Sequence, residues 1–121
     1  MANTSFPREG RLLKSEEFDA VFKNPVRASA PGIVVLAKKN GLNRPRLGLV
    51  VPKKVLKRAV WRNRVKRLVR ETFRLHQDTL PAADLVFIAR PKIGEISNKD
   101  FCAALTRLWN SISRRLDNQQ S

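Results

Sequence analysis

Hydrophobic residues between positions 56 and 76 recur every three or four positions, which predicts a long amphipathic helix over residues 56–76. The polar positions in the same stretch are mostly cationic: residues 53–74 contain ten Lys or Arg and a single acidic residue, Glu71. The predicted apolar stripe consists of Trp61, Val65, Leu68, Val69, Thr72 and Phe73. We therefore expect a helix that packs through one side and presents positive charge on the other.

Compact apolar runs predict the strands. Residues 33–37, 47–51 and 85–89 are rich in Val, Ile and Leu and are bounded by Pro, Gly or Asn. Residues 26–30 are ambiguous and are compatible with a short edge strand. The run 85–89 is apolar at every position, which favours a central strand buried on both faces. The first two of these runs are expected to pair with each other as antiparallel neighbours.

A short helix is predicted ahead of the strands. Ser15 is a suitable N-cap, and Phe18, Val21 and Phe22 have the spacing of one helical face. Pro25 should end this helix, because the residue before a proline disfavours the helical conformation. The two phenylalanines are most simply core residues. The alternative is that they line a groove against the sheet, where aromatic rings can stack on unpaired bases.

The last helix is predicted to begin at Ser97 or Asn98. Its core stripe is Phe101, Ala104, Leu105, Leu108, Ile112 and Leu116, with Trp109 at the edge. Residues 1–14 and 117–121 are expected to be flexible. The chain is thus predicted to be one α+β domain, residues 1–121, in which helices cover one sheet of about four strands.

Composition indicates the kind of partner. The chain has 121 residues, 25 of them basic and 10 acidic, which gives a net charge of +15. A charge of that size opposes compaction unless anions are bound, so nucleic acid is the leading partner and an anionic membrane surface is second. The membrane alternative is weak, because basic residues run through the whole chain instead of forming one anchor. The single Cys102 excludes an intramolecular disulfide. No signal peptide or membrane span is predicted, so we expect a cytoplasmic protein.

No catalytic group is predicted in the protein itself. His76 is the only histidine and is expected to be half-buried near the end of the long helix. Cys102 is expected to act as a small hydrophobic residue in the last helix. The carboxylates are scattered, and no glycine pattern resembles a phosphate-binding loop. A stand-alone metal-dependent nuclease would need paired acids, which this sequence lacks.

The long helix carries the strongest functional signal. Arg62, Lys66, Arg70 and Arg74 are expected on its far side, with Asn63 and Arg67 beside them and Arg64 on the opposite flank, nearer the apolar stripe. Like charges four residues apart destabilise a helix by roughly 0.2–0.5 kcal/mol per pair. Such repulsion indicates that an anion is bound in the working state. The absence of helix-turn-helix spacing disfavours a DNA-binding module.

These motifs resemble the bacterial ribonuclease P protein component. The resemblance rests on Lys53-Lys54 followed by the run from Ala59 to Phe73, which reads AVWRNRVKRLVRETF, and it extends over nearly the whole chain. It implies an α+β fold of order α-β-β-β-α-β-α with a left-handed βαβ crossover. It also implies a protein that is inactive alone and that binds the catalytic RNA of ribonuclease P and the 5′ leader of precursor tRNA. That RNA, with Mg²⁺ held mainly by it, hydrolyses the phosphodiester bond that releases the leader.

The resemblance also assigns residues. The RNA-binding set corresponds to Lys53, Lys54, Arg62, Asn63, Arg64, Lys66, Arg67 and Arg70, and the leader-binding cleft to Phe18, Phe22, Val34 and Leu36. Leu36 stands where relatives have tyrosine. The family also has a metal-binding loop, whose position in this chain is left unassigned because residues 92–95 hold no carboxylate cluster. No membrane and no obligatory protein partner is implied. The remaining alternative is a ribosomal or RNA-chaperone protein with no role in tRNA cleavage.

Overall fold

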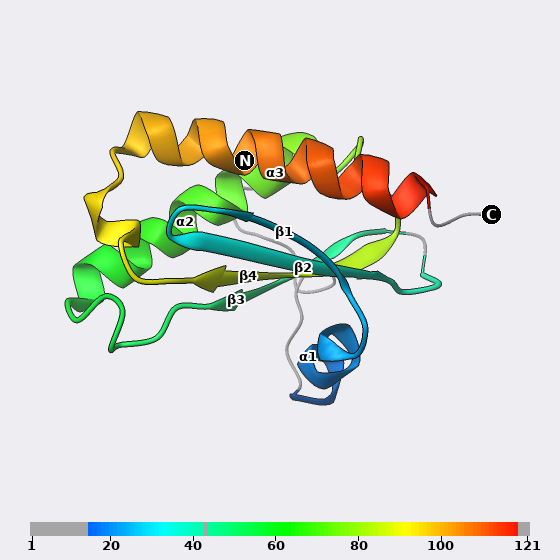
Figure 1. Cartoon of the computed structure of the whole chain (residues 1–121), viewed down its shortest axis with the longest axis horizontal. Coiled ribbons are helices and arrows are strands. Elements are labelled where there is room, and N and C mark those ends of the chain that lie inside the picture. The colour runs from blue at the N-terminus through cyan, green and yellow to red at the C-terminus, as the bar shows by residue number, and fades with distance from the viewer. Residues whose placement is uncertain (1–14, 43, 119–121) are drawn as a thin grey trace, which may run out of the picture.

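The computed structural model describes residues 15–42 and 44–118 and shows an α+β domain (Figure 1). Its elements, in chain order, are α1 (Ser15–Phe22), β1 (Val26–Ala30), β2 (Ile33–Lys39), β3 (Arg46–Val50), α2 (Ala59–His76), β4 (Ala83–Ala89), a 3₁₀ turn η2 (Ile93–Glu95) and α3 (Asn98–Asn118). This order is the one expected from the sequence, and the ambiguous segment 26–30 is a strand at the edge of the sheet.

The sheet has the strand order β1-β2-β4-β3, so the expected pairing of β2 with β3 is wrong. Strand β4 lies between them, antiparallel to β2 and parallel to β3. Val86, for example, is opposite Leu36 on one side and Gly48 on the other. The physical reason is burial: β4 is the most apolar strand and is stabilised best by neighbours on both edges. The central position predicted for this strand is confirmed.

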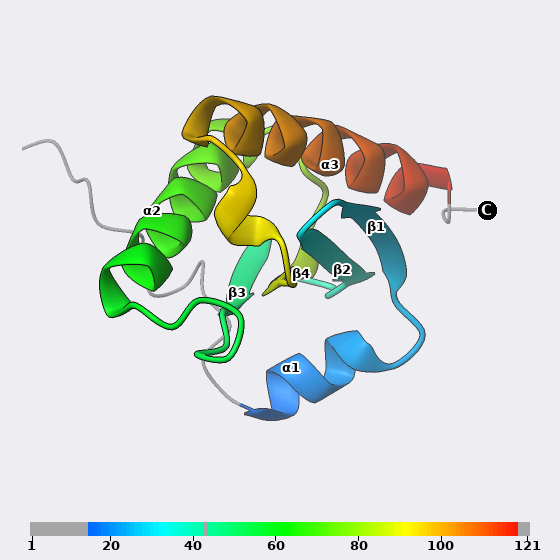
Figure 2. The same cartoon turned by 60° about the vertical axis from the view of Figure 1, so that its left-hand side comes forward.

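The sheet separates two layers of helix that differ in thickness. Figure 2 shows α2 and α3 on one face and the short α1 on the other. Along β4 the side chains alternate between these layers, because successive residues of a strand point to opposite faces. Leu85 and Phe87 belong to the large core under α2 and α3, whereas Val86 packs with Val21 of α1. Side chains of β4 that point to one face thus pack under α2 and α3, and those that point to the other face pack under α1.

The turn between β1 and β2 depends on Gly32. This residue has φ +80°, and a Cβ placed there would lie 2.8 Å from the Cα of Ile93 in η2. The Gly32 carbonyl also accepts a hydrogen bond from the Arg90 backbone N–H at 3.0 Å. The close approach fixes η2 against the end of the sheet, and η2 in turn leads the chain into α3.

Helix α3 packs through the predicted stripe, and Trp109 is part of that core instead of its edge. The indole is 1% exposed and makes an edge-to-face contact with Phe73 of α2 at a centroid distance of 5.8 Å. Its N–H donates to the Thr72 hydroxyl at 3.2 Å. A buried indole requires such an acceptor, and Thr72 supplies it from α2. The sequence placed Trp109 at the edge because its partner lies 37 residues away.

Three smaller expectations have clear outcomes. His76 is half-buried at the last residue of α2, with Nδ1 2.8 Å from the Thr72 carbonyl, as predicted. Cys102 is a free thiol and is half-buried, less enclosed than expected. Residues 117 and 118, predicted to belong to the flexible tail, form the last turn of α3. The expected flexibility of residues 1–14 and 119–121 lies outside the described residues.

Candidate nucleic-acid interface

The two halves of α2 have different surroundings. Val69, Thr72 and Phe73 in its second half are buried against the sheet and α3. The first turns extend past the ends of β3 and β4 (Figure 1), and there Val60 and Trp61 are 64% and 46% exposed. Trp61 was expected to face the core and does not, because the sheet does not reach that far. The first half of α2 is therefore a rigid projection held by its buried second half.

The helix begins at Ala59, three residues later than predicted. Pro52 starts a tight turn in which its carbonyl accepts the N–H groups of Val55 and Leu56 at 3.1 and 3.2 Å. This turn buries Leu56 in the core, so these residues cannot take part in the helix. It leaves the predicted RNA-binding residues Lys53 and Lys54 exposed on the surface, directly after β3.

The cationic face of α2 is rotated from the one predicted. Residues four apart advance about 40° around a helix, so the row that starts at Arg62 winds from the flank of the buried stripe to the far side. Arg62, Lys66 and Arg70 are accordingly half-buried. The exposed residues of the predicted face are Asn63, Arg67 and Arg74, and Arg64 of the opposite flank is exposed as well. The face most open to a polyanion therefore centres on Asn63 and Arg67.

Arg62 and Arg64 also have structural contacts. Arg62 Nη1 donates to the carbonyls of Leu56 and Lys57 at 2.9 and 2.8 Å, which holds the preceding turn against the helix. Arg64 Nε donates to Asn98 Oδ1 at 2.9 Å, and Nη2 donates to the same oxygen. Arg64 thereby joins α2 to the first residue of α3. Within residues 15–42 and 44–118, neither arginine forms an ion pair with a carboxylate.

The predicted leader-binding residues lie on the opposite face of the sheet. Val34 and Leu36 point from β2 toward the α1 side, where Phe18 and Leu36 pack around Val21 and Val86. Val34 is 8% exposed, and Phe22 is 45% exposed at the end of α1. Phe18 thus has the core role and Phe22 the accessible ring, which the spacing alone left undecided. The α2 residues of the RNA-binding set and the leader-binding set are therefore on different faces of the sheet.

An ion-pair network that sequence reasoning missed holds α1 on the sheet. Arg46 of β3 binds Asp84 of β4 through two parallel hydrogen bonds, from Nε at 2.8 Å and Nη2 at 2.7 Å, and its Nη1 donates to Glu17 of α1 at 3.0 Å. Asn40 adds a hydrogen bond to Asp84 Oδ1 at 2.9 Å. The hydrogen bond with Asp84 raises the pKa of Arg46; burial opposes that rise and attraction to both carboxylates adds to it. The available signal was Asp84, a charged residue directly before an all-apolar run.

The described residues show neither a metal centre nor a membrane-spanning helix. No group of three or more His, Cys, Asp or Glu side chains within them is placed to hold a metal ion. The helices of this part of the chain include none that is long and apolar enough to cross a membrane.

Comparisons with known proteins agree on one family. The Ribonuclease P family model matches residues 6–113. The chain is 55% identical over 109 residues to the ribonuclease P protein component of Haemophilus influenzae, with 90% of this chain and 92% of that one covered. It is 51% identical over 112 residues to the component from Aliivibrio fischeri, covering 93% and 96%.

Solved structures give the same result. The ribonuclease P protein of Staphylococcus aureus superposes with a TM-score of 0.80 at 27% identity, covering 86% of this chain and 97% of that one. The protein from Thermotoga maritima has a TM-score of 0.71 at 35% identity, covering 86% and 96%. The basic helix, the mixed sheet and these similarities lead to one conclusion. The chain belongs to the ribonuclease P protein family, whose members are protein components of a ribonucleoprotein endoribonuclease.

Proposed function

We propose that this chain binds the catalytic RNA of ribonuclease P through the exposed face of α2 and the 5′ leader of precursor tRNA through the α1 side of the sheet. The observation that carries the first part is the exposed cationic face around Asn63 and Arg67, which projects on a rigid helix. Arginines in such an array neutralise phosphates, and Asn63 can both donate to and accept from a base edge or a 2′-hydroxyl. Lys53 and Lys54 extend the same cationic surface.

The leader assignment rests on the position of Phe22. Its ring is 45% exposed on the face that also carries Val34 and Leu36, so it offers a stacking surface for an unpaired base. A leader is single-stranded and presents such bases. Leu36 at this face contributes apolar contact only, because it has no hydroxyl to donate or accept a hydrogen bond.

We assign the Mg²⁺ of the reaction to the RNA. Mg²⁺ prefers oxygen ligands and keeps several waters, a requirement that phosphate oxygens meet. The protein side chains in this proposal bind and orient RNA and reduce the repulsion between its phosphates. Bond cleavage belongs to the RNA, and this work takes place in the cytoplasm, a reducing compartment that suits a chain with one cysteine.

Reconstitution tests the proposal directly. The full chain is added to a bacterial ribonuclease P RNA at low Mg²⁺, and removal of the 5′ leader from precursor tRNA is measured. We expect cleavage to be much faster with the protein than without it, because the protein supplies positive charge that Mg²⁺ would otherwise provide. Protein without RNA should cleave nothing. Cleavage by the protein alone, or no stimulation of the RNA, would contradict the proposal.

The cationic face has its own test. Replacing Arg67 by Ala should weaken binding to the catalytic RNA and lower the slope of log affinity against log salt by about 1, because one phosphate contact is lost. Arg107→Ala is the matched control, since it removes the same charge from an exposed position on α3. Equal slopes for the two variants would show that α2 is not the main RNA contact.

A further inference from the structure

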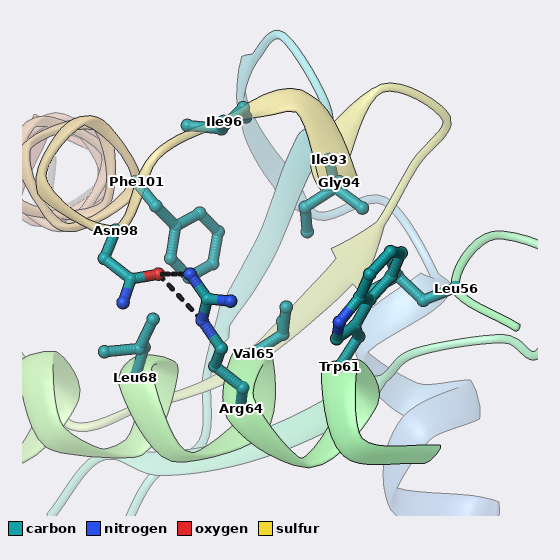
Figure 3. A pocket seen from close by; sticks show the side chains of 10 residues that line it. All are labelled: Leu56, Trp61, Arg64, Val65, Leu68, Ile93, Gly94, Ile96, Asn98 and Phe101. Carbon is teal, nitrogen blue, oxygen red and sulfur yellow. Dashed lines mark hydrogen bonds between the residues drawn. The ribbon is translucent and has the colours of Figure 1, made fainter. Parts of the chain in front are cut away.

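Trp61 is the exposed aromatic ring nearest the cationic face of α2, and it forms a wall shared by two hollows. One hollow lies between α2, η2 and the start of α3 (Figure 3). The other lies between the turn that precedes α2 and the segment around η2. Trp61, Leu56 and Gly94 line both. Neither hollow includes a residue of the predicted leader-binding face, which is on the other side of the sheet.

The first hollow is an apolar pocket of about 140 Å³. Val65 lies between the Trp61 ring and the side chains of Arg64 and Phe101 (Figure 3), and Ile93 contributes from η2. Its polar groups are gathered at one place, the Arg64–Asn98 contact. Asn98 Oδ1 accepts both hydrogen bonds from Arg64, which leaves the Asn98 amide N–H₂ group as a donor. Within the described residues, Arg64 Nη1 has no hydrogen-bond partner. The pocket therefore combines apolar walls with the guanidinium donor of Arg64 on one side.

The second hollow is larger, about 430 Å³, and is strongly cationic. Lys54, Lys57, Arg58 and Lys92 line it, against one carboxylate, that of Glu95. The Arg58 guanidinium carbon lies 5.4 Å from the centre of the Trp61 ring, close enough for a cation–π contact. Positive charge is thus placed on one side of the indole and an apolar pocket on the other.

We propose that these two hollows together bind one unstacked nucleotide of an RNA partner, with the base in the apolar pocket against Trp61 and the phosphate in the cationic hollow. This assignment rests on the proposed function, since it gives the RNA partner a specific contact. A nucleotide fits because it carries a planar base with apolar faces and an anionic phosphate in one molecule. The apolar pocket and the cationic hollow are likewise next to each other, since Trp61 lines both. Arg64 Nη1 supplies a hydrogen-bond donor for an acceptor atom on the edge of the base.

Fluorescence tests the stacking. Trp61 and Trp109 are the two tryptophans of the chain, and Trp109 is buried at 1% exposure, so a base that stacks on the protein surface quenches Trp61 selectively. The full chain is titrated with the catalytic RNA alone and, separately, with precursor tRNA alone. Quenching in the first arm identifies the catalytic RNA as the source of the base, and quenching only in the second identifies the substrate. No quenching in either arm overturns the proposal, as does quenching that persists in Trp61→Phe.

Affinity gives the second readout. Stacking on an aromatic ring contributes about 1–3 kcal/mol per base, so Trp61→Ala should weaken binding of the RNA that quenches by roughly 5- to 150-fold. The salt dependence should be unchanged, because no charge is removed, whereas Arg58→Ala should lower the salt slope by about 1. Trp61→Phe should retain most of the affinity, because a phenyl ring can still stack on the base. Val60→Ala is the control, since Val60 is the exposed neighbour and lines neither hollow.

The outcomes separate this inference from the proposed function. If Trp61→Ala binds RNA as tightly as Val60→Ala does, the nucleotide site is refuted, while stimulation of leader removal by the unaltered chain still supports the function. If the unaltered chain fails to stimulate the catalytic RNA, the function fails regardless of what Trp61 does. If an apolar peptide is the true occupant, neither RNA quenches Trp61 and Trp61→Ala binds RNA as tightly as the unaltered chain does. That result also refutes the nucleotide site.

Discussion

The two faces of the sheet are built in different ways. Under α2 and α3, twenty-two buried hydrophobic residues form one continuous cluster that includes Phe73, Phe87 and Trp109. Under α1, the buried cluster within residues 15–42 and 44–118 consists of Val21 and Val86, with half-buried residues around them. The burial of apolar surface, the main source of folding free energy, is thus concentrated on one face. The thinner face leaves apolar side chains such as Phe22 accessible, which a binding surface for unstacked bases requires.

Specific polar contacts compensate for the small core beneath α1. Arg46 joins β3, β4 and α1 through Asp84 and Glu17. A bidentate arginine–carboxylate pair has a fixed geometry, so it orients α1 as well as attaching it. One face of the sheet is stabilised by the close packing of many buried apolar side chains, and the other by a few directional polar contacts. Variants can test that difference directly.

The largest effect is expected in the core under α2. Phe73→Ala should lower the free energy of unfolding by about 3–5 kcal/mol, because it removes a fully buried ring and leaves a cavity next to Trp109. Denaturant unfolding followed by circular dichroism measures it. Leu75→Ala on the same helix is the control, since Leu75 is 70% exposed and should change stability by less than about 0.5 kcal/mol. Similar losses in both variants would contradict the assignment of Phe73 to the main core under α2.

A smaller loss of stability is expected when the ion-pair network around Arg46 is broken. Arg46→Met should destabilise by about 1–3 kcal/mol, because the Asp84 side chain is 8% exposed and would lose its guanidinium partner. Asp84→Asn and the double variant complete a double-mutant cycle, which isolates the coupling between the two residues. A coupling energy near zero would show that the Arg46–Asp84 ion pair adds no stability beyond what each side chain contributes separately. Precursor-tRNA affinity should fall with Arg46→Met, since α1 carries the leader-binding ring.

The smallest change in stability, with a clear change in binding, is expected at the end of α1. Phe22→Ala should alter the free energy of unfolding by less than about 0.5 kcal/mol, because the ring is largely outside the core. It should weaken the binding of precursor tRNA by roughly 5-fold or more, because one stacking contact is lost. Binding of mature tRNA, which has no leader, is the control. Equal losses for both tRNAs would remove Phe22 from the leader-binding site.

The local pattern of apolar and polar residues was sufficient to predict several features of this protein. The order of elements, the central position of β4, the stripe of α3 and the cationic character of α2 all follow from spacing and residue type. These features depend on residues a few positions apart, whose relative placement on a helix or strand is set by backbone geometry. The family resemblance likewise rested mainly on Lys53-Lys54 and the continuous run of residues 59–73.

Tertiary structure decided what depends on distant residues. Which strand separates β2 from β3, how far the sheet extends beneath α2, and which partner encloses Trp109 all require contacts between remote segments. The same is true of Arg64: its spacing placed it on a flank of the helix, but only the fold brought Asn98 to it, 34 residues later in the chain. Pattern shows which side of an element is apolar. It does not show what covers that side, because the covering element is chosen by the burial achieved in the whole fold.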